Sequence, residues 1–107
     1  MIVDVRTYRC RTGGVAPQLA MYEKHGFAAQ TRHLGQPLAY LVAETGELNT
    51  FTHLWAYESA GEREQKRAAM MADPEWQEFV RRMVEAQYVV HQQTSLKVPA
   101  SFAPIKR

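Results

Sequence analysis

The stretch Glu44-Thr-Gly-Glu-Leu-Asn-Thr-Phe-Thr-His-Leu-Trp-Ala-Tyr57 decides the fold of this 107-residue chain. Side chains alternate between the two faces of a strand, so the odd-numbered positions share one face. Those positions carry Asn49, Phe51, His53, Trp55 and Tyr57. A strand that only filled a core would carry Val, Ile or Leu there, whereas this face combines rings with hydrogen-bonding groups. The pattern predicts the wall of a cavity.

Length and charge limit the classes of protein to which the chain can belong. With 107 residues, it is expected to form one domain over residues 1–107 that buries roughly 65% of the unfolded surface. The net charge of +2 comes from Lys and Arg interspersed with acids, as in residues 62–67. Because a phosphate-binding surface needs clustered basic residues, no nucleic-acid partner is predicted.

Cysteine content and hydropathy bear on the compartment. Cys10 is the only cysteine, so no intrachain disulfide can form and a reducing compartment is the default. Arg9 and Arg11 flank it, but no base lies beside it in sequence, and we interpret it as a plain thiol at a strand end. No apolar run approaches the roughly 20 residues of a membrane span, and no signal peptide precedes the first strand. We therefore expect a cytoplasmic protein without a membrane span.

Periodicity and helix-end signals predict the order of the elements. Ser59 and Glu62 match a capping box that starts one helix, and Asp73 with Pro74 starts another. Strands are predicted over 2–10, 38–44, 49–57 and 87–96, with helices over 15–30, from 60 to 71 and from 74 onward. Trp76, Phe79, Val80 and Met83 form the apolar face of the last helix. The order β-α-β-β-α-β predicts an α+β, ferredoxin-like fold.

In such a fold the helices cover only one face of the sheet. We expect the uncovered face to carry Asp4, Arg6 and Tyr8 with the ring-bearing side of the third strand, a surface too aromatic to leave in water. A second copy of the chain would cover it, because twofold homodimers are the commonest oligomers. The tail over 98–107 contains Phe102 and Ile105 and is expected to pack on the domain or on its partner.

Several spaced motifs together resemble the NIPSNAP family. They are Asp4-x-Arg6-x-Tyr8, Glu44-Thr-Gly-Glu-Leu-Asn49, His53-Leu-Trp-Ala-Tyr57, Arg63, Arg67, Asp73-Pro-Glu-Trp76 and Pro99-x-x-Phe102-x-Pro104. The resemblance implies a dimeric α+β barrel in which the sheets of two protomers face one another around a pocket. It carries no agreed catalytic residues. Eukaryotic relatives are longer, with mitochondrial targeting segments and suggested roles in vesicle traffic or mitophagy signalling, and this chain resembles the compact bacterial form. Family members often have Glu where this chain has Asp4.

The candidate site is centred on His53. Its ordinary pKa near 6.5 suits an acid, a base or a metal ligand, although a structural, hydrogen-bonded histidine is an equal alternative. Glu44 and Asn49 are expected to orient the imidazole. Arg6 and Tyr8 are expected to bind a carboxylate or enolate oxygen, or else to pair with Asp4 or Glu44. Trp55 and Tyr57 complete the predicted substrate-binding wall.

The other charged and imidazole groups are given structural interpretations. Arg63 and Arg67, one helical turn apart among acids, are interpreted as a solvated helix surface. His25, His33 and His91 lack metal-ligand spacing, so neither a metal nor a cofactor is predicted.

Two classes of function remain open. In the first, the homodimer binds a small aromatic or anionic molecule in its barrel pocket, with or without cofactor-free acid/base or monooxygenase chemistry. In the second, the chain is a non-catalytic interaction module whose polar-aromatic wall is only dimer core. The sequence does not decide whether the protein is an enzyme, since fold alone does not fix function.

Overall fold

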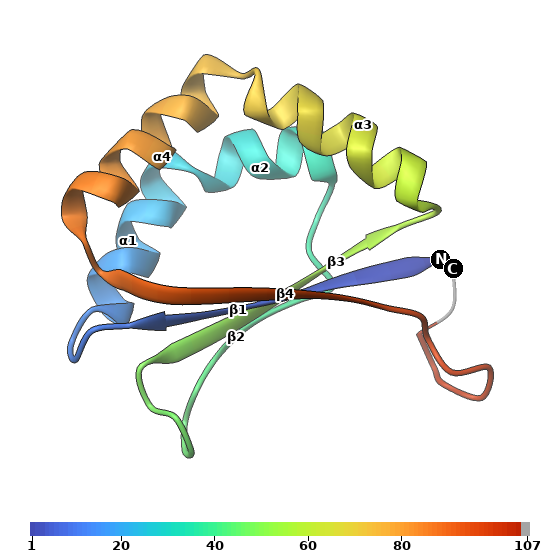
Figure 1. The fold of residues 1–107 in the computed structure, drawn as a ribbon, viewed down its shortest axis with the longest axis horizontal. Helices are drawn as coiled ribbons and strands as arrows, with labels where there is room; N and C mark the ends of the chain where they lie inside the picture. Colours follow the sequence, from blue (N-terminus) through green and yellow to red (C-terminus); the bar gives the residue numbers. More distant parts are fainter. Residues whose placement is uncertain (106–107) are drawn as a thin grey trace.

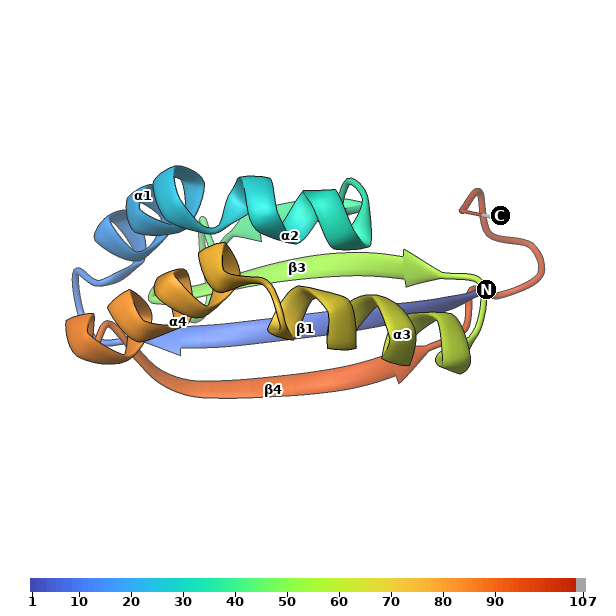
Figure 2. The same cartoon turned by 90° about the horizontal axis from the view of Figure 1, so that it is seen from above.

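The computed structural model describes residues 1–105, which form a four-stranded antiparallel sheet with four helices over one face (Figure 1). The elements in chain order are β1 (Ile2–Cys10), α1 (Val15–His25), α2 (Phe27–Leu34), β2 (Ala39–Val42), β3 (Thr50–Tyr57), α3 (Ala60–Met71), α4 (Pro74–Ala86) and β4 (Val89–Lys97). The strand order is β2-β3-β1-β4, with every neighbouring pair antiparallel. This confirms the predicted α+β, ferredoxin-like fold. Seen from above, the helices form two rows across the sheet, α1 with α2 and α4 with α3 (Figure 2).

The predicted starts of α3 and α4 are confirmed by their hydrogen bonds. The Ser59 hydroxyl accepts from the Glu62 amide at 3.1 Å, and the Glu62 carboxylate reaches back to the Glu58 amide. At α4 the Asp73 carboxylate accepts from the Glu75 amide at 2.9 Å, and Pro74 occupies the first turn. Each cap satisfies amides that the helix itself leaves unpaired.

The helix predicted over 15–30 is two helices, broken at Gly26. A Cβ atom at this glycine would lie 2.9–3.0 Å from three ring carbons of Phe79 on α4. The backbone of the first helical row therefore touches the aromatic ring of the second, an approach that only a residue without a side chain allows. The second helix extends to Leu34, beyond the predicted end.

The expectation that the ring-bearing face is uncovered is wrong. In the β1–β3 pairing, Asp4 lies opposite Trp55, Arg6 opposite His53 and Tyr8 opposite Phe51, so these residues do share a face. That face lies under the protomer's own helices, and His53 and Trp55 are only 4% and 1% exposed. Alternation establishes which side chains lie together, but it does not say on which face the helices pack.

Contacts with two helices explain why the rings prefer the covered side. Trp55 and Tyr57 form a core cluster with Leu34 of α2 and Met70 of α3. Burial of large rings stabilises the fold, provided that their polar atoms find partners inside. The polar-aromatic wall is thus the interior of one protomer and not a surface awaiting a second copy.

The opposite face of the sheet carries smaller side chains and meets the C-terminal segment. Val3, Val5 and Leu54 line a space on this face together with Pro99 and Ile105. The segment leaves Phe102 88% exposed. Residues 106–107 of the predicted tail lie outside the described part.

Within residues 1–105, no helix has both the length and the apolar character needed to cross a membrane.

Candidate functional site

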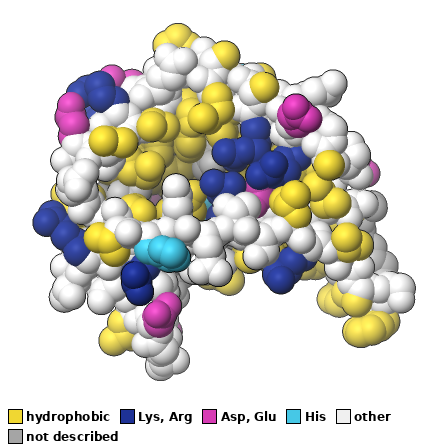
Figure 3. All heavy atoms as spheres, in the orientation of Figure 1, with side chains coloured by type: hydrophobic (Ala, Val, Ile, Leu, Met, Phe, Trp, Pro, Cys, Tyr) yellow, Lys and Arg dark blue, Asp and Glu magenta, His cyan; other side chains and the backbone are white. Residues whose placement is uncertain are grey.

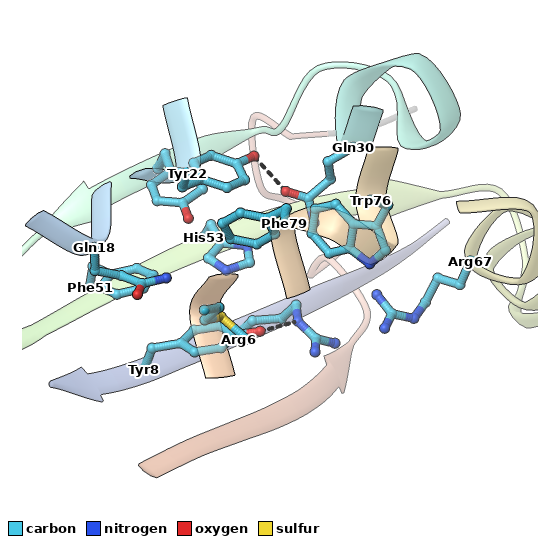
Figure 4. A pocket seen from close by; sticks show the side chains of 12 residues that line it. Arg6, Tyr8, Gln18, Tyr22, Gln30, Phe51, His53, Arg67, Trp76 and Phe79 are labelled. Carbon is cyan, nitrogen blue, oxygen red and sulfur yellow. Dashed lines mark hydrogen bonds between the residues drawn. The ribbon is translucent and has the colours of Figure 1, made fainter. Parts of the chain in front are cut away.

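A cavity of about 60 Å³ lies between the sheet and the helices (Figure 4). Its floor comes from β1, β2 and β3 and its roof from α1, α2, α3 and α4. The lining residues are Arg6, Tyr8, Gln18, Tyr22, Gln30, Tyr40, Phe51, His53, Arg67, Trp76, Phe79 and Met83. Of the five residues predicted to form a cavity wall, only Phe51 and His53 line this cavity, and it lies on the helix-covered side.

His53 lies in the floor with a fixed protonation pattern. The Trp55 indole N–H donates to His53 Nδ1 at 2.6 Å, so the neutral ring carries its proton on Nε2. Stacking against Tyr40 at 4.6 Å and Tyr8 at 5.1 Å holds the ring in place. Burial, reinforced by the charges of Arg6 and Arg67, lowers the pKa of His53 to about 3. At neutral pH the residue is a hydrogen-bond donor, and its acid/base role stays a prediction.

Three guanidinium groups gather near one carboxylate at the edge of the cavity, and two of them bind it. Asp4 is fully buried, and its Oδ2 accepts from Arg63 Nε at 3.0 Å and from Arg6 Nη1 at 3.4 Å. Arg67 extends from α3 toward Arg6 and makes no hydrogen bond or ion pair with the described residues (Figure 4). Burial and the neighbouring charge of Arg6 lower the pKa of Arg67. The cluster therefore carries more positive than negative charge.

Arg6 is held by two partners. Its Nε donates to the Tyr8 hydroxyl at 3.2 Å, while its Nη1 faces Asp4. Burial disfavours the charge of Arg6, but the interactions with Tyr8 and Asp4 outweigh it and raise the pKa. The predicted pairing of Arg6 with Asp4 is confirmed, and the guanidinium still lines the cavity.

The cluster is visible from outside. Figure 3 shows Lys and Arg side chains gathered in the hollow between α3 and the sheet, with an acidic side chain among them and apolar side chains beside them. A charged mouth next to an apolar interior is a common arrangement in small-molecule sites.

Three buried polar atoms in the interior have no hydrogen-bond partner among the residues that the structure describes. They are Asp4 Oδ1, Gln18 Oε1 and the Tyr57 hydroxyl. Most buried polar groups in proteins are paired, so each such atom calls for an explanation. The Tyr22 hydroxyl and the Gln30 carbonyl, which bond to each other, show the ordinary case in the same cavity.

The structure brings together only part of the predicted site. Arg6, Tyr8 and His53 line the cavity, and Trp55 and Tyr57 lie in the adjoining core. The orienting role expected of Glu44 and Asn49 is wrong. Glu44 is exposed in the connection after β2, and Asn49 precedes β3. Neither lines the cavity. The partner that orients the His53 imidazole is the indole N–H of Trp55, which binds Nδ1.

Other cavity residues escaped sequence reasoning. Arg63 and Arg67 were interpreted as a solvated surface, but Arg63 binds Asp4 and Arg67 lines the cavity. Their spacing of one helical turn was the available signal, because it places both on one side of α3. Gln18, Gln30 and Tyr40 carried no signal in the sequence.

Within residues 1–105, no group of three or more His, Cys, Asp or Glu side chains is arranged to hold a metal ion.

Comparison with known proteins shows the family. The NIPSNAP family model matches residues 3–104. The chain belongs to the NIPSNAP family. Protein NipSnap homolog 3B of Homo sapiens is 44% identical over 105 residues, which are 98% of this chain and 42% of that protein. Protein NipSnap homolog of Dictyostelium discoideum is 34% identical over 72% of this chain and 34% of its own length. The NIPSNAP chain thus spans less than half of these curated relatives.

Solved structures agree with this assignment. A NIPSNAP family protein with unknown function from Agrobacterium tumefaciens superposes with a TM-score of 0.92 at 32% identity, covering 99% of this chain and 94% of that one. An uncharacterized NIPSNAP domain protein from Burkholderia xenovorans gives 0.90 at 34% identity over 98% and 100%. A putative antibiotic biosynthesis monooxygenase from Deinococcus radiodurans gives 0.62 at 16% identity over the full length of both chains, a likeness of fold alone.

Proposed function

We propose that this NIPSNAP domain binds a small organic anion, a carboxylate, in the cavity between its sheet and its helices. The observation that carries the proposal is the imbalance of charge around Asp4, where Arg6, Arg63 and Arg67 face one carboxylate. A half-buried charge without a partner is costly, and an anionic ligand would supply the missing acceptor.

Arg67 is the side chain that a bound anion would pair most directly. Its guanidinium reaches into the cavity and has no acceptor among the described residues. Arginine presents parallel N–H donors that match the two oxygens of a carboxylate. The Nε2–H group of neutral His53 adds an uncharged donor in the floor of the same cavity.

The size of the cavity narrows the class of ligand. An engineered cavity of about 150 Å³ is large enough for benzene. The cavity here measures about 60 Å³. This favours an aliphatic anion of a few carbons over the aromatic ligand that the sequence also allowed.

The proposal concerns binding only, because acid/base catalysis would also need a side chain that can act as the general base. A general base should have a pKa near the working pH. Because the pKa of His53 lies at about 3, this imidazole is better suited to donate a hydrogen bond to a bound oxygen than to remove a proton.

The test is a titration of the protein with short-chain carboxylates at constant ionic strength, followed by calorimetry and by thermal shift. We expect binding to the native chain and a loss of at least tenfold in affinity for Arg67→Gln. Arg82→Gln on α4 removes the same charge from an exposed position and serves as the control. Equal affinities for the two variants, or no binding by any carboxylate, would overturn the proposal.

We also propose that the domain forms a homodimer through the sheet face that the helices leave free. Val5 and Leu54 lie on that face, and Leu41 of β2 is 56% exposed there. In sedimentation at micromolar concentration, the native chain should be dimeric and Leu41→Asp should shift it to monomer. Val84→Asp places the same charge at a comparably exposed site on α4 and should leave the dimer intact. If the native chain is a monomer, the dimer proposal is refuted, and the ligand-binding proposal is unaffected.

A further inference from the structure

Gln18 is a buried side chain whose amide carbonyl lacks a donor. It projects from α1 into the cavity, is only 2% exposed, and its Oε1 accepts no hydrogen bond from any residue of 1–105. An unsatisfied buried acceptor typically costs about 1–3 kcal/mol. The other amide in the cavity lining, that of Gln30, avoids this cost by accepting from the Tyr22 hydroxyl.

Gln18 lies away from the cationic cluster. In Figure 4 it sits beside Phe51, whereas Arg67 approaches Arg6 on the other side of the cavity. Phe51 pairs with Tyr8, two residues along β1 from the pair formed by Arg6 and His53. The cavity therefore has two polar subsites, one on each side.

The roof over the space between the two subsites is apolar and comes from Trp76, Phe79 and Met83 of α4. Its floor holds Phe51 and the imidazole of His53, both on β3. Methylene groups are favourable against such walls, since each buried one contributes about 0.8 kcal/mol.

We propose that the ligand is a short-chain hydroxy acid, with its carboxylate at Arg6 and Arg67 and its hydroxyl on the amide of Gln18. This inference rests on the proposed anion-binding function and adds the second polar group of the ligand. A hydroxyl both donates and accepts, so it pairs with either end of an amide. An ammonium group is disfavoured in a cavity whose charged side chains are guanidinium groups.

The size and geometry set the chain length. A cavity of about 60 Å³ keeps the carbon chain of the ligand short. Because Gln18 and Arg67 lie on opposite sides of the cavity, the hydroxyl is expected at the end of the chain that is far from the carboxylate. The probe of choice is therefore 4-hydroxybutyrate.

The experiment compares 4-hydroxybutyrate with butyrate and with 1,4-butanediol by calorimetry on the full chain. One net hydrogen bond is worth about 0.5–1.5 kcal/mol, so 4-hydroxybutyrate should bind roughly two- to tenfold more tightly than butyrate. The diol, which lacks the anion, should not bind measurably. Gln18→Met keeps the volume but removes the amide, so it should bind both acids equally, with the affinity for butyrate retained.

The outcomes separate this inference from the proposed function. If butyrate binds the native chain as tightly as 4-hydroxybutyrate, the hydroxyl subsite is refuted while the anion site stands. If neither acid binds, the hydroxyl subsite and the anion site are both refuted. If Gln18→Met weakens both acids by the same factor, Gln18 supports the fold and not the ligand. Gln18→Asn is the second variant: its shorter side chain should move the preference from 4-hydroxybutyrate to 5-hydroxypentanoate, and an unchanged preference would also refute the subsite.

Discussion

The indole nitrogen of Trp55 donates to Nδ1 of His53 across 2.6 Å, between two side chains that are almost fully buried. The bond joins next-but-one neighbours on β3, which share a face because strand side chains alternate. It fixes one tautomer of the imidazole and directs the Nε2–H group away from Trp55. The chemistry available to the cavity at neutral pH follows from this one contact.

The depressed pKa of His53 predicts that stability falls in mild acid. In the unfolded chain an imidazole takes up a proton near pH 6.5, whereas His53 in the fold takes one up only at about pH 3. Between these values the unfolded state binds more protons, so the free energy of unfolding decreases as the pH falls, by up to about 1.4 kcal/mol per pH unit. Urea unfolding of the native chain and of His53→Gln at pH 7, 6, 5 and 4 measures this contribution as their difference. A difference that stays constant with pH would contradict it.

Removal of the charge of Asp4 should destabilise the fold and make it dependent on added anions. Its Oδ2 is the acceptor for both Arg6 and Arg63, and the side chain is fully buried. In Asp4→Asn the guanidinium groups repel one another without a counter-charge, and we expect a loss of about 3–5 kcal/mol in the free energy of unfolding. Sulfate at constant ionic strength should restore more stability to the variant than to the native chain.

Asp4→Glu serves as the control for this prediction. It keeps the negative charge, so it should be less destabilised than Asp4→Asn and should show no additional response to sulfate. An equal response of both variants would mean that charge at this position is not what holds the cluster together.

The sequence predicted the fold through local signals. The alternation of residues 2–10 and 50–57 specified the strands, and the caps at Ser59 and Asp73 specified where α3 and α4 begin. The close approach of Gly26 to the ring of Phe79 could not be read in the same way, because the two residues are more than 50 positions apart in the chain. The choice of sheet face had no local signal either, since alternation is symmetric between the two faces.

The site was predicted only where two directly paired strands supply its residues. His53, Arg6 and Tyr8 were found because β1 and β3 pair directly, and pairing in a ferredoxin-like fold follows from element order. Arg67 and Gln18 come from different helices, and their approach depends on how those helices pack on the sheet. An arginine in a charged helix resembles solvated surface until its neighbours in space are known.

The close approach at Gly26 predicts that even a methyl group is not tolerated there. Gly26→Ala would place a Cβ atom 2.9–3.0 Å from ring carbons of Phe79. Because the ring is buried between helices, we expect the variant to lose about 1–3 kcal/mol in the free energy of unfolding. Gly61→Ala on α3 is the matched control: its nearest contact is Ser59 Oγ at 3.8 Å, so it should be neutral or stabilising by up to about 1 kcal/mol. Urea denaturation of both variants decides the point, and equal stabilities would rule out the steric account.

Tyr40 is expected to limit the length of the ligand. Its ring stacks on His53 at 4.6 Å and on Tyr22 at 5.2 Å. The side chains of Tyr40 and Tyr22 also line an apolar groove outside the cavity, together with Leu19 and Phe27. Tyr40→Ala should join the two spaces, because truncation of a packed aromatic ring leaves a void that neighbouring side chains fill only in part.

The consequence is a change of specificity that calorimetry can detect. Tyr40→Ala should bind acids of six to eight carbons at least tenfold more tightly than the native chain does, and should lose affinity for four-carbon acids. Tyr40→Phe keeps the ring and removes only the hydroxyl, so it should retain the native preference for short chains. If Tyr40→Ala folds but still rejects long acids, the ring of Tyr40 is not the barrier, and Tyr22, which lines both spaces, becomes the candidate.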